Sequence, residues 1–169
     1  MKQLRKSSKS YQNFPLLIFA SATFFINGCT QPYPRALDST NIEWATYSNR
    51  QLNYSMKYPN IYSKSEAKDG KEVVFKYDGI TAIRVVFVSE EEGDSRGLWV
   101  GNKAVEKIEM GGQEGYRYVY DHYDAIASVH TISCVIEYKG KFLGLEFRTA
   151  NNMLDDVQKK VLTSMEFEI

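Results

Sequence analysis

The dipeptide Asp78-Gly79 constrains the fold of this chain more than any other feature of the sequence. It stands between residues 72–77 and 80–88, two runs rich in the β-branched and aromatic side chains that favour strands. Asp-Gly accepts positive φ at both central positions of a type I′ turn, so the segment predicts a β-hairpin. The second run is apolar at nearly every position apart from Arg84. It therefore predicts a central strand that is covered on both faces, on at least one of them by helices.

Further strand patterns lie on both sides of this hairpin. Residues 51–58 alternate strictly between apolar and polar side chains, as a half-buried strand requires, and Pro59 ends the pattern. Lys139-Gly140 predicts a second tight turn, whereas residues 89–97 are expected to form a charged loop. Other strands are expected over residues 104–110, 116–121, 126–138 and 141–149, with a short strand at residues 165–169.

The period of the apolar residues changes to about 3.6 near the C-terminus, which predicts an amphipathic helix. Asn151 or Asn152 is the expected N-cap. The polar side of the helix carries the acid-first pairs 155/159 and 156/160. Its apolar stripe consists of Met153, Leu154, Val157, Val161 and Leu162. These patterns together predict an α+β fold, an antiparallel sheet of about six to eight strands with flanking helices.

The first 28 residues have the three parts of a secretory signal peptide: a basic start, an apolar run over residues 14–26, and a small residue at the cleavage position. This run of 13 residues is too short for a transmembrane helix, which needs roughly 20. The ending Ile26-Asn27-Gly28-Cys29 resembles the lipobox of bacterial lipoproteins. The resemblance implies diacylglyceryl transfer to the Cys29 thiol, cleavage after Gly28 and N-acylation of Cys29. The alternative is an ordinary secretory signal followed by a chance cysteine.

A lipoprotein of this kind is held at the cell envelope, in the membrane, by two or three acyl chains such as palmitate. Thr30 follows the cysteine, in place of the Asp that retains lipoproteins at the inner membrane of enteric-type bacteria. This implies the outer membrane in a Gram-negative source and the outer face of the plasma membrane otherwise. Residues 29–43 are rich in turn formers and predict a tether, and residues 44–169 predict a single domain.

The charge balance argues against a nucleic-acid partner. The leader carries four of the 21 basic and none of the 21 acidic side chains, so 17 basic side chains face 21 acidic ones in the remainder. A mildly acidic chain without a Lys/Arg cluster lacks the electrostatic footprint of nucleic-acid binders. The sequence has two cysteines. If Cys29 is acylated, Cys134 has no partner for a disulfide, and the domain must be stable without one.

The order of segments resembles the PsbP-like fold, named for the extrinsic photosystem II protein and also seen in bacterial envelope lipoproteins. The resemblance covers roughly residues 44–169 and implies an α/β/α sandwich. Most members are binding or assembly factors, so the resemblance implies no catalytic residue. The family usually has Phe where this chain has Met165. The resemblance is carried by packing motifs at residues 53–59 (Asn-Tyr-Ser-Met-Lys-Tyr-Pro), 140–147 (Gly-Lys-Phe-Leu-Gly-Leu-Glu-Phe) and 161–167 (Val-Leu-Thr-Ser-Met-Glu-Phe).

Two histidines invite a catalytic or metal-binding interpretation. His130 and Cys134 share a face of one predicted strand, but four residues along a strand span about 13 Å, too far for a nucleophile and its base. A buried thiol and a cross-strand histidine are the simpler interpretation. His122 could bind zinc with Asp121 or Asp124, although a closed zinc site needs four ligands and no second cluster is evident. A solvated turn is expected there, and we expect no metal, cofactor or catalytic residue.

Two loops resemble ligand-binding motifs only in part. Glu90-Glu91-Glu92-Gly93-Asp94 is acidic but lacks the alternating spacing and the distal Glu of a calcium loop. It predicts a solvated acidic loop. Gly111-Gly112-Gln113-Glu114-Gly115 is rich in glycine, yet neither Gly-Lys-Ser/Thr nor a helix follows it. It predicts a turn rather than a phosphate loop.

Tyr116, Tyr118 and Tyr120 share one face of a predicted strand. Exposed tyrosines supply contact area with a polar tip, which suits another envelope protein or a glycan. The alternative is a half-buried sheet face whose hydroxyls reach water. With two histidines and no convergent acid–base motif, the chain predicts a non-enzymatic binding or assembly module at the envelope. The alternative is an envelope hydrolase or a metal-handling protein with an unrecognised site.

Overall fold

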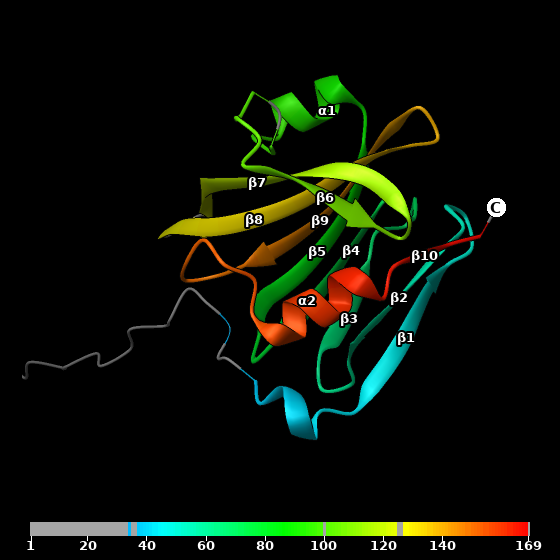
Figure 1. Ribbon diagram of the computed structural model, residues 1–169, viewed down its shortest axis with the longest axis vertical. Helices are drawn as coiled ribbons and strands as arrows, with labels where there is room; N and C mark the ends of the chain where they lie inside the picture. Colours follow the sequence, from blue (N-terminus) through cyan, green and yellow to red (C-terminus); the bar gives the residue numbers. More distant parts are fainter. Residues whose placement is uncertain (1–33, 35–36, 100, 125–126, 169) are drawn as a thin grey trace, which may run out of the picture. The chain divides into compact units, whose positions relative to one another are not determined.

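The computed structural model describes residues 34, 37–99, 101–124 and 127–168 (Figure 1). The elements of this part of the chain are a 3-10 helix, ten strands and two α-helices. In chain order they are η1 (Ser39–Asn41), β1 (Trp44–Asn49), β2 (Tyr54–Pro59), β3 (Ser63–Glu66), β4 (Glu72–Tyr77), β5 (Ile80–Val88), α1 (Glu90–Ser95), β6 (Glu106–Met110), β7 (Gln113–Asp124), β8 (Ala127–Tyr138), β9 (Lys141–Arg148), α2 (Asp156–Thr163) and β10 (Glu166–Phe167).

Seven of the strands form one antiparallel sheet in the order β3-β4-β5-β9-β8-β7-β6. The hairpin predicted around Asp78-Gly79 is confirmed, because both residues have positive φ (50° and 77°) and β4 pairs with β5. Lys139-Gly140 likewise turns β8 into β9, with φ of 51° and 70°. β5 lies between β4 and β9 and is largely buried, as its apolar composition predicted.

The remaining three strands form a second sheet in the order β1-β2-β10. β2 is half-buried as expected, with Tyr54 and Met56 among its buried residues. It begins at Tyr54 rather than at residue 51, because residues 51–53 form a turn with Asn53 at a φ of 57°, and it includes Pro59 as its last residue. The C-terminal strand β10 joins β2 through the pairs Glu166↔Ser55 and Phe167↔Tyr54. The prediction of an antiparallel sheet of about six to eight strands is therefore confirmed by the seven-stranded sheet, whereas the separate three-stranded sheet was not predicted.

One hydrophobic core lies between the two sheets. Phe75, Ile83 and Leu145 of the large sheet pack in the same cluster as Tyr54 and Met56 of the small sheet. Helix α2 contributes its buried stripe to this cluster and lies beside β2 (Figure 1). The small sheet and α2 together therefore cover one face of the seven-stranded sheet, which we call the core face. The opposite face is called the outer face below.

The outer face has a much smaller cover. α1 follows the end of β5, and Leu98 and Trp99 then pack on Val86, Val88 and Val135 in a second, smaller cluster. The predicted α/β/α sandwich is thus only partly present, as an α+β fold with two helices and no helical layer over the outer face of the described residues.

Four local predictions differ from the structure. The segment 89–97 is not only a loop, because Ser89 and Glu92 form a capping box that starts α1. The N-cap of α2 is Asp155, whose carboxylate accepts from the Gln158 amide, rather than Asn151 or Asn152. Met153, placed in the apolar stripe from the sequence, is 70% exposed because it precedes the helix. The glycine-rich turn is shorter than expected, because β7 already begins at Gln113.

Candidate functional site

The three tyrosines lie on the outer face of β7, but their exposure differs. Tyr116 is 47% exposed, Tyr118 is half-buried and Tyr120 is only 7% exposed. Tyr118 packs at the edge of the small cluster that contains Trp99, whereas Tyr120 belongs to its buried part. Two of the three rings, Tyr116 and Tyr118, therefore remain accessible to a partner, and Tyr120 has a different role.

Tyr120 takes part in a buried polar network in the middle of the outer face. Its hydroxyl donates to Glu146 Oε1 at 2.7 Å. Arg84 reaches the other carboxylate oxygen of Glu146 through Nε and Nη2, each at 2.5 Å. Burial and the adjacent Glu146 carboxylate both raise the pKa of Tyr120, so the phenol stays protonated. Burial alone would lower the pKa of Arg84, but the Glu146 carboxylate outweighs it and raises that pKa.

The register of the strands explains how this network is assembled. Arg84 on β5 faces Glu146 on β9, Glu146 faces Ser133 on β8, and Ser133 faces Tyr118 on β7. Because paired residues point to the same side of a sheet, these four side chains form one row across the outer face. Ser133 is fully buried, and within the described part of the chain its hydroxyl has no hydrogen-bond partner.

A cavity of about 210 Å³ opens beside this row, and we call it the polar cavity. It lies over β4, β5, β9 and β8. Its lining is mostly polar or charged and consists of Glu72, Val74, Lys76, Thr81, Arg84, Thr131, Glu146 and Arg148. The polar cavity is thus built around the Arg84–Glu146 ion pair, in which the carboxylate is buried and the guanidinium is partly exposed.

A second hollow of about 250 Å³ lies over β6 to β9 on the same face. Tyr116, Tyr118 and Phe142 contribute aromatic walls, while Lys107 and Glu137 add charge. We call it the aromatic hollow. Trp99 packs directly on Gly144 of this face, where a Cβ would lie 2.4 Å from the indole ring. The absence of a side chain at position 144 is therefore what allows the indole to pack this close to the sheet.

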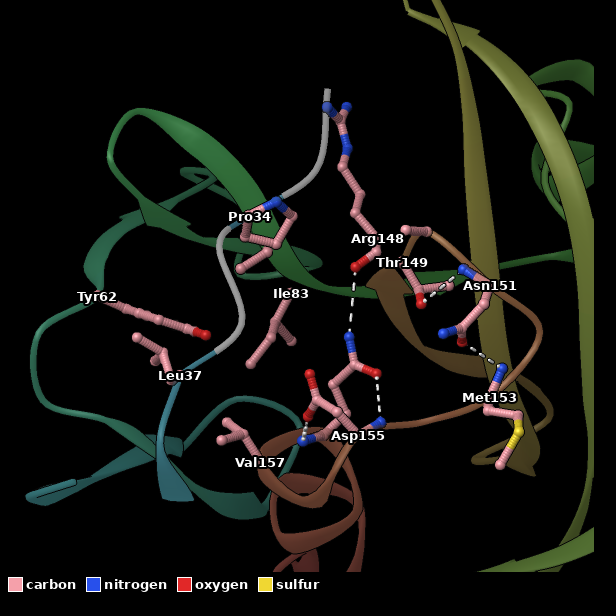
Figure 2. Close-up of a pocket in the computed structure, with 13 residues that line it drawn as sticks. Pro34, Leu37, Tyr62, Ile83, Arg148, Thr149, Asn151, Met153, Asp155 and Val157 are labelled. Carbon is pink, nitrogen blue, oxygen red and sulfur yellow. Dashed lines mark hydrogen bonds between the residues drawn. The ribbon is translucent and has the colours of Figure 1, made fainter. Parts of the chain in front are cut away.

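A third cavity, of about 180 Å³, lies elsewhere, where α2 begins (Figure 2). Leu37, Ile83 and Val157 form apolar parts of its wall. Its polar groups bind one another: Gln158 donates to the Arg148 carbonyl, and Asp155 and Gln158 cap the helix (Figure 2). The amide of Gln158 at the start of α2 is therefore already satisfied, and this cavity offers a ligand mainly apolar contact.

Cys134 and His130 have the surroundings of structural residues. Cys134 is fully buried, and burial raises the pKa of its thiol to about 12. His130 Nδ1 lies 2.5 Å from Asp121 Oδ1, and Nε2 contacts the side-chain oxygen of Asn152. Arg117 donates to the backbone oxygen of the same Asn152 at 2.8 Å. These contacts hold the segment before α2 against the sheet.

The structure also locates the acidic run, the glycine-rich segment and the possible metal ligands that the sequence offered as candidate sites. The acidic run Glu90-Glu91-Glu92-Gly93-Asp94 lies in α1, with Glu92 committed to the capping box. Gly111 and Gly112 form a hairpin turn with φ of 59° and 78°. Among the described residues, no group of three His, Cys, Asp or Glu could hold a metal ion. The side chains of His122 and Asp124 lie outside the described residues, as do Gly28 and Cys29.

Glu146 and the role of Tyr120 were not predicted from the sequence. One signal was available, because Arg84 is the single charged residue in an otherwise apolar strand. Its partner lies 62 positions away, at a site where the sequence gives only an ordinary alternating strand. A buried charge needs a partner, so Arg84 could have indicated that a carboxylate lies across the sheet.

Comparison with solved structures shows the fold. The solution structure of cyanobacterial PsbP (CyanoP) from Synechocystis sp. PCC 6803 matches with a TM-score of 0.51 and 18% identity, over 79% of this chain and 98% of that chain. A crystal structure from Bacteroides thetaiotaomicron VPI-5482 matches with a TM-score of 0.53 and 9% identity, over 73% of this chain and 48% of that chain. No family model and no curated protein matches the sequence. The domain thus has a PsbP-like fold, as the sequence resemblance predicted.

Proposed function

We propose that this chain is a lipoprotein of the bacterial cell envelope, anchored through Cys29, whose domain binds or assembles another envelope component. The proposal of an anchor rests on the leader and on the lipobox-like ending Ile26-Asn27-Gly28-Cys29. In the described part of the chain, no helix is long and apolar enough to cross a membrane. The PsbP-like fold supports a binding role, because the sequence resemblance implies a family in which most members bind or assemble other proteins.

The aromatic hollow is the observation that carries the binding role. Tyr116 and Tyr118 stand at its edge with accessible rings, and Phe142 lies in its wall. Clustered aromatic side chains dominate the energies of many interfaces, because they bury a large area at a small entropic cost. Lys107, Glu114 and Glu137 surround these rings with polar groups, as in an interface with an apolar centre and a polar rim.

In-cell crosslinking of the full-length lipoprotein tests this proposal. We expect Tyr116→Ala and Tyr118→Ala to weaken or remove the crosslinked species, because each removes an aromatic ring from the hollow. Ile61→Ala is the matched control, since Ile61 is 56% exposed and does not line the hollow. If all three variants give unchanged crosslinks and unchanged melting curves, the aromatic hollow is not the partner surface.

A further inference from the structure

A row of carboxylates borders the aromatic hollow on the outer face. Glu109 on β6 lies directly opposite Glu114 on β7. The register of β7 and β8 continues this row to Glu137, which lines the hollow together with Glu114. Because residues in register point to the same side of a sheet, the three carboxylates share the outer face with Tyr116. We call Glu109, Glu114 and Glu137 the acidic row.

The carboxylates of the acidic row are exposed and uncompensated. Within the part of the chain that the structure describes, the ion pairs engage other carboxylates, and no hydrogen bond ends on the side chains of this row. Lys107 is the one cation among the described residues that line the hollow. Like charges directly opposite one another destabilise a sheet. A cationic group bound at the hollow would therefore relieve repulsion as well as complement the negative excess.

The aromatic rings beside the acidic row favour a ligand of the same charge. Tyr116 is 47% exposed, Tyr118 is half-buried, and Phe142 lies in the wall of the hollow. The face of an aromatic ring is electron-rich and attracts a cation that lies within about 6 Å of its centre. A planar guanidinium can stack on such a ring while it donates hydrogen bonds to a carboxylate. The rings and the carboxylates of the hollow therefore suit an arginine side chain.

We infer that the aromatic hollow receives an arginine side chain of the partner protein, which stacks on an accessible tyrosine and pairs with a carboxylate of the acidic row. At about 250 Å³ the hollow is smaller than the roughly 300–1,000 Å³ of pockets that enclose a whole drug-sized ligand, so it suits one side chain of a larger molecule. The negative excess repels an anionic lipid head group and adds nothing to the binding of a neutral glycan. This inference rests on the proposed function and deepens it, because it names the chemistry by which that surface recognises its partner.

Titration of the full-length protein in micelles of a non-ionic detergent tests the inference. The probe is an end-capped pentapeptide in which arginines alternate with glycines, followed by amide chemical shifts. The same peptide with glutamine in place of arginine is the neutral control, and maltose represents a glycan. We expect saturable shifts in β6, β7 and β8 with the arginine peptide, weakened by added salt. Absence of saturation with the arginine peptide, equal affinity for the glutamine peptide, or saturation by maltose alone overturns the inference.

Matched variants locate the binding in the hollow. Glu114→Gln and Glu137→Gln each remove one charge and keep the shape of the side chain, and we expect each to raise the Kd of the arginine peptide about two- to fivefold. Lys107→Met removes a repelling cation and should lower the Kd by a similar factor. Glu166→Gln is the control, because Glu166 is an exposed glutamate of the small sheet. All four side chains are exposed, so these substitutions leave the core intact. Equal Kd values for the wild type and the three variants of the hollow overturn the inference.

The inference and the proposed function fail in different ways. If the in-cell crosslinks respond to Tyr116→Ala and Tyr118→Ala but not to Glu114→Gln and Glu137→Gln, the partner surface stands and the recognition of arginine does not. If peptide binding responds to the charge variants while the crosslinks ignore the tyrosine variants, the hollow binds arginine and the proposed partner surface is overturned.

Discussion

Cys134 illustrates how burial by remote segments determines the chemistry of a single residue. It lies on the core face of β8, is fully inaccessible, and faces Leu145 and Arg117 on the two neighbouring strands. Burial raises the pKa of its thiol from 9.0 to about 12. A thiol that stays protonated in the native protein is a poor nucleophile.

The raised pKa predicts a stability difference that depends on pH. Between pH 9 and about 12 the unfolded thiol releases its proton while the folded thiol keeps it, so the folded state loses stability by about 1.4 kcal/mol per pH unit. The Cys134→Ala variant has no thiol at this position, so its stability does not fall for this reason. In urea melts we expect the variant to be less stable than the wild type at pH 8, by about 1–2 kcal/mol. We expect this difference to close above pH 9 and to reverse by about pH 11. The buried tyrosines titrate in the wild type and in the variant alike, so their contribution to the stability difference cancels. A gap that stays constant with pH contradicts the assignment.

Helix α2 shows how a short element depends on its cap and on one buried stripe. It has eight residues, from Asp156 to Thr163, and isolated helices of that length are unstable in water. Asp155 and Gln158 cap its first turn reciprocally. Val157 and Val161 are buried against the rest of the domain, whereas Asp156 is exposed. Tertiary packing therefore supplies most of its stability.

Three variants of α2 rank these contributions. Val157→Asp should cost about 3 kcal/mol or more, because it buries a charge in the apolar core. Asp155→Ala should cost about 1 kcal/mol through the lost N-cap. Asp156→Ala, a matched change one position away, should cost less than about 0.5 kcal/mol. Urea midpoints of the purified protein measure all three, and equal midpoints would mean that the position or orientation of the helix is wrong.

The whole molecule combines one core with a segment that leads to the proposed anchor. The two sheets and α2 share that core, and Leu37 packs against it although it belongs to the region predicted as a tether. η1 follows, with Asp38 as its N-cap. The packed part of the chain therefore begins no later than Leu37, inside the 29–43 segment that composition predicted as a tether.

Replacing Cys29 tests whether the whole protein is anchored to the membrane through this residue. We expect Cys29→Ser to move the protein from the membrane pellet to the soluble fraction, because serine has no thiol to receive a diacylglyceryl group. Cys134→Ala, which removes the other cysteine, should stay in the pellet. Cell fractionation with immunodetection measures both. A Cys29→Ser protein that remains wholly in the membrane pellet excludes acylation at Cys29 as its anchor.

Local chemistry was enough to predict the turns and the strands they join. Asp78-Gly79 and Lys139-Gly140 tolerate the positive φ of a tight turn, so both hairpins could be predicted from the sequence. The register shift at Phe75 and Lys76 in the first hairpin could not. The apolar stripe of α2 likewise shows in the spacing of Val157, Val161 and Leu162. The capping box Ser89–Glu92 is also a local signal, and α1 could have been found from it.

Only the tertiary structure decided which strands share a sheet and which face of each strand is covered. Alternation assigns Tyr116, Tyr118 and Tyr120 to one side of β7 but does not determine what packs on that side, so it could not show that Tyr120 is buried while Tyr116 is exposed. The Arg84–Glu146 pair joins residues 62 positions apart. Such contacts depend on strand order, which follows from burying the apolar surface of the whole chain together, and no short segment contains that information.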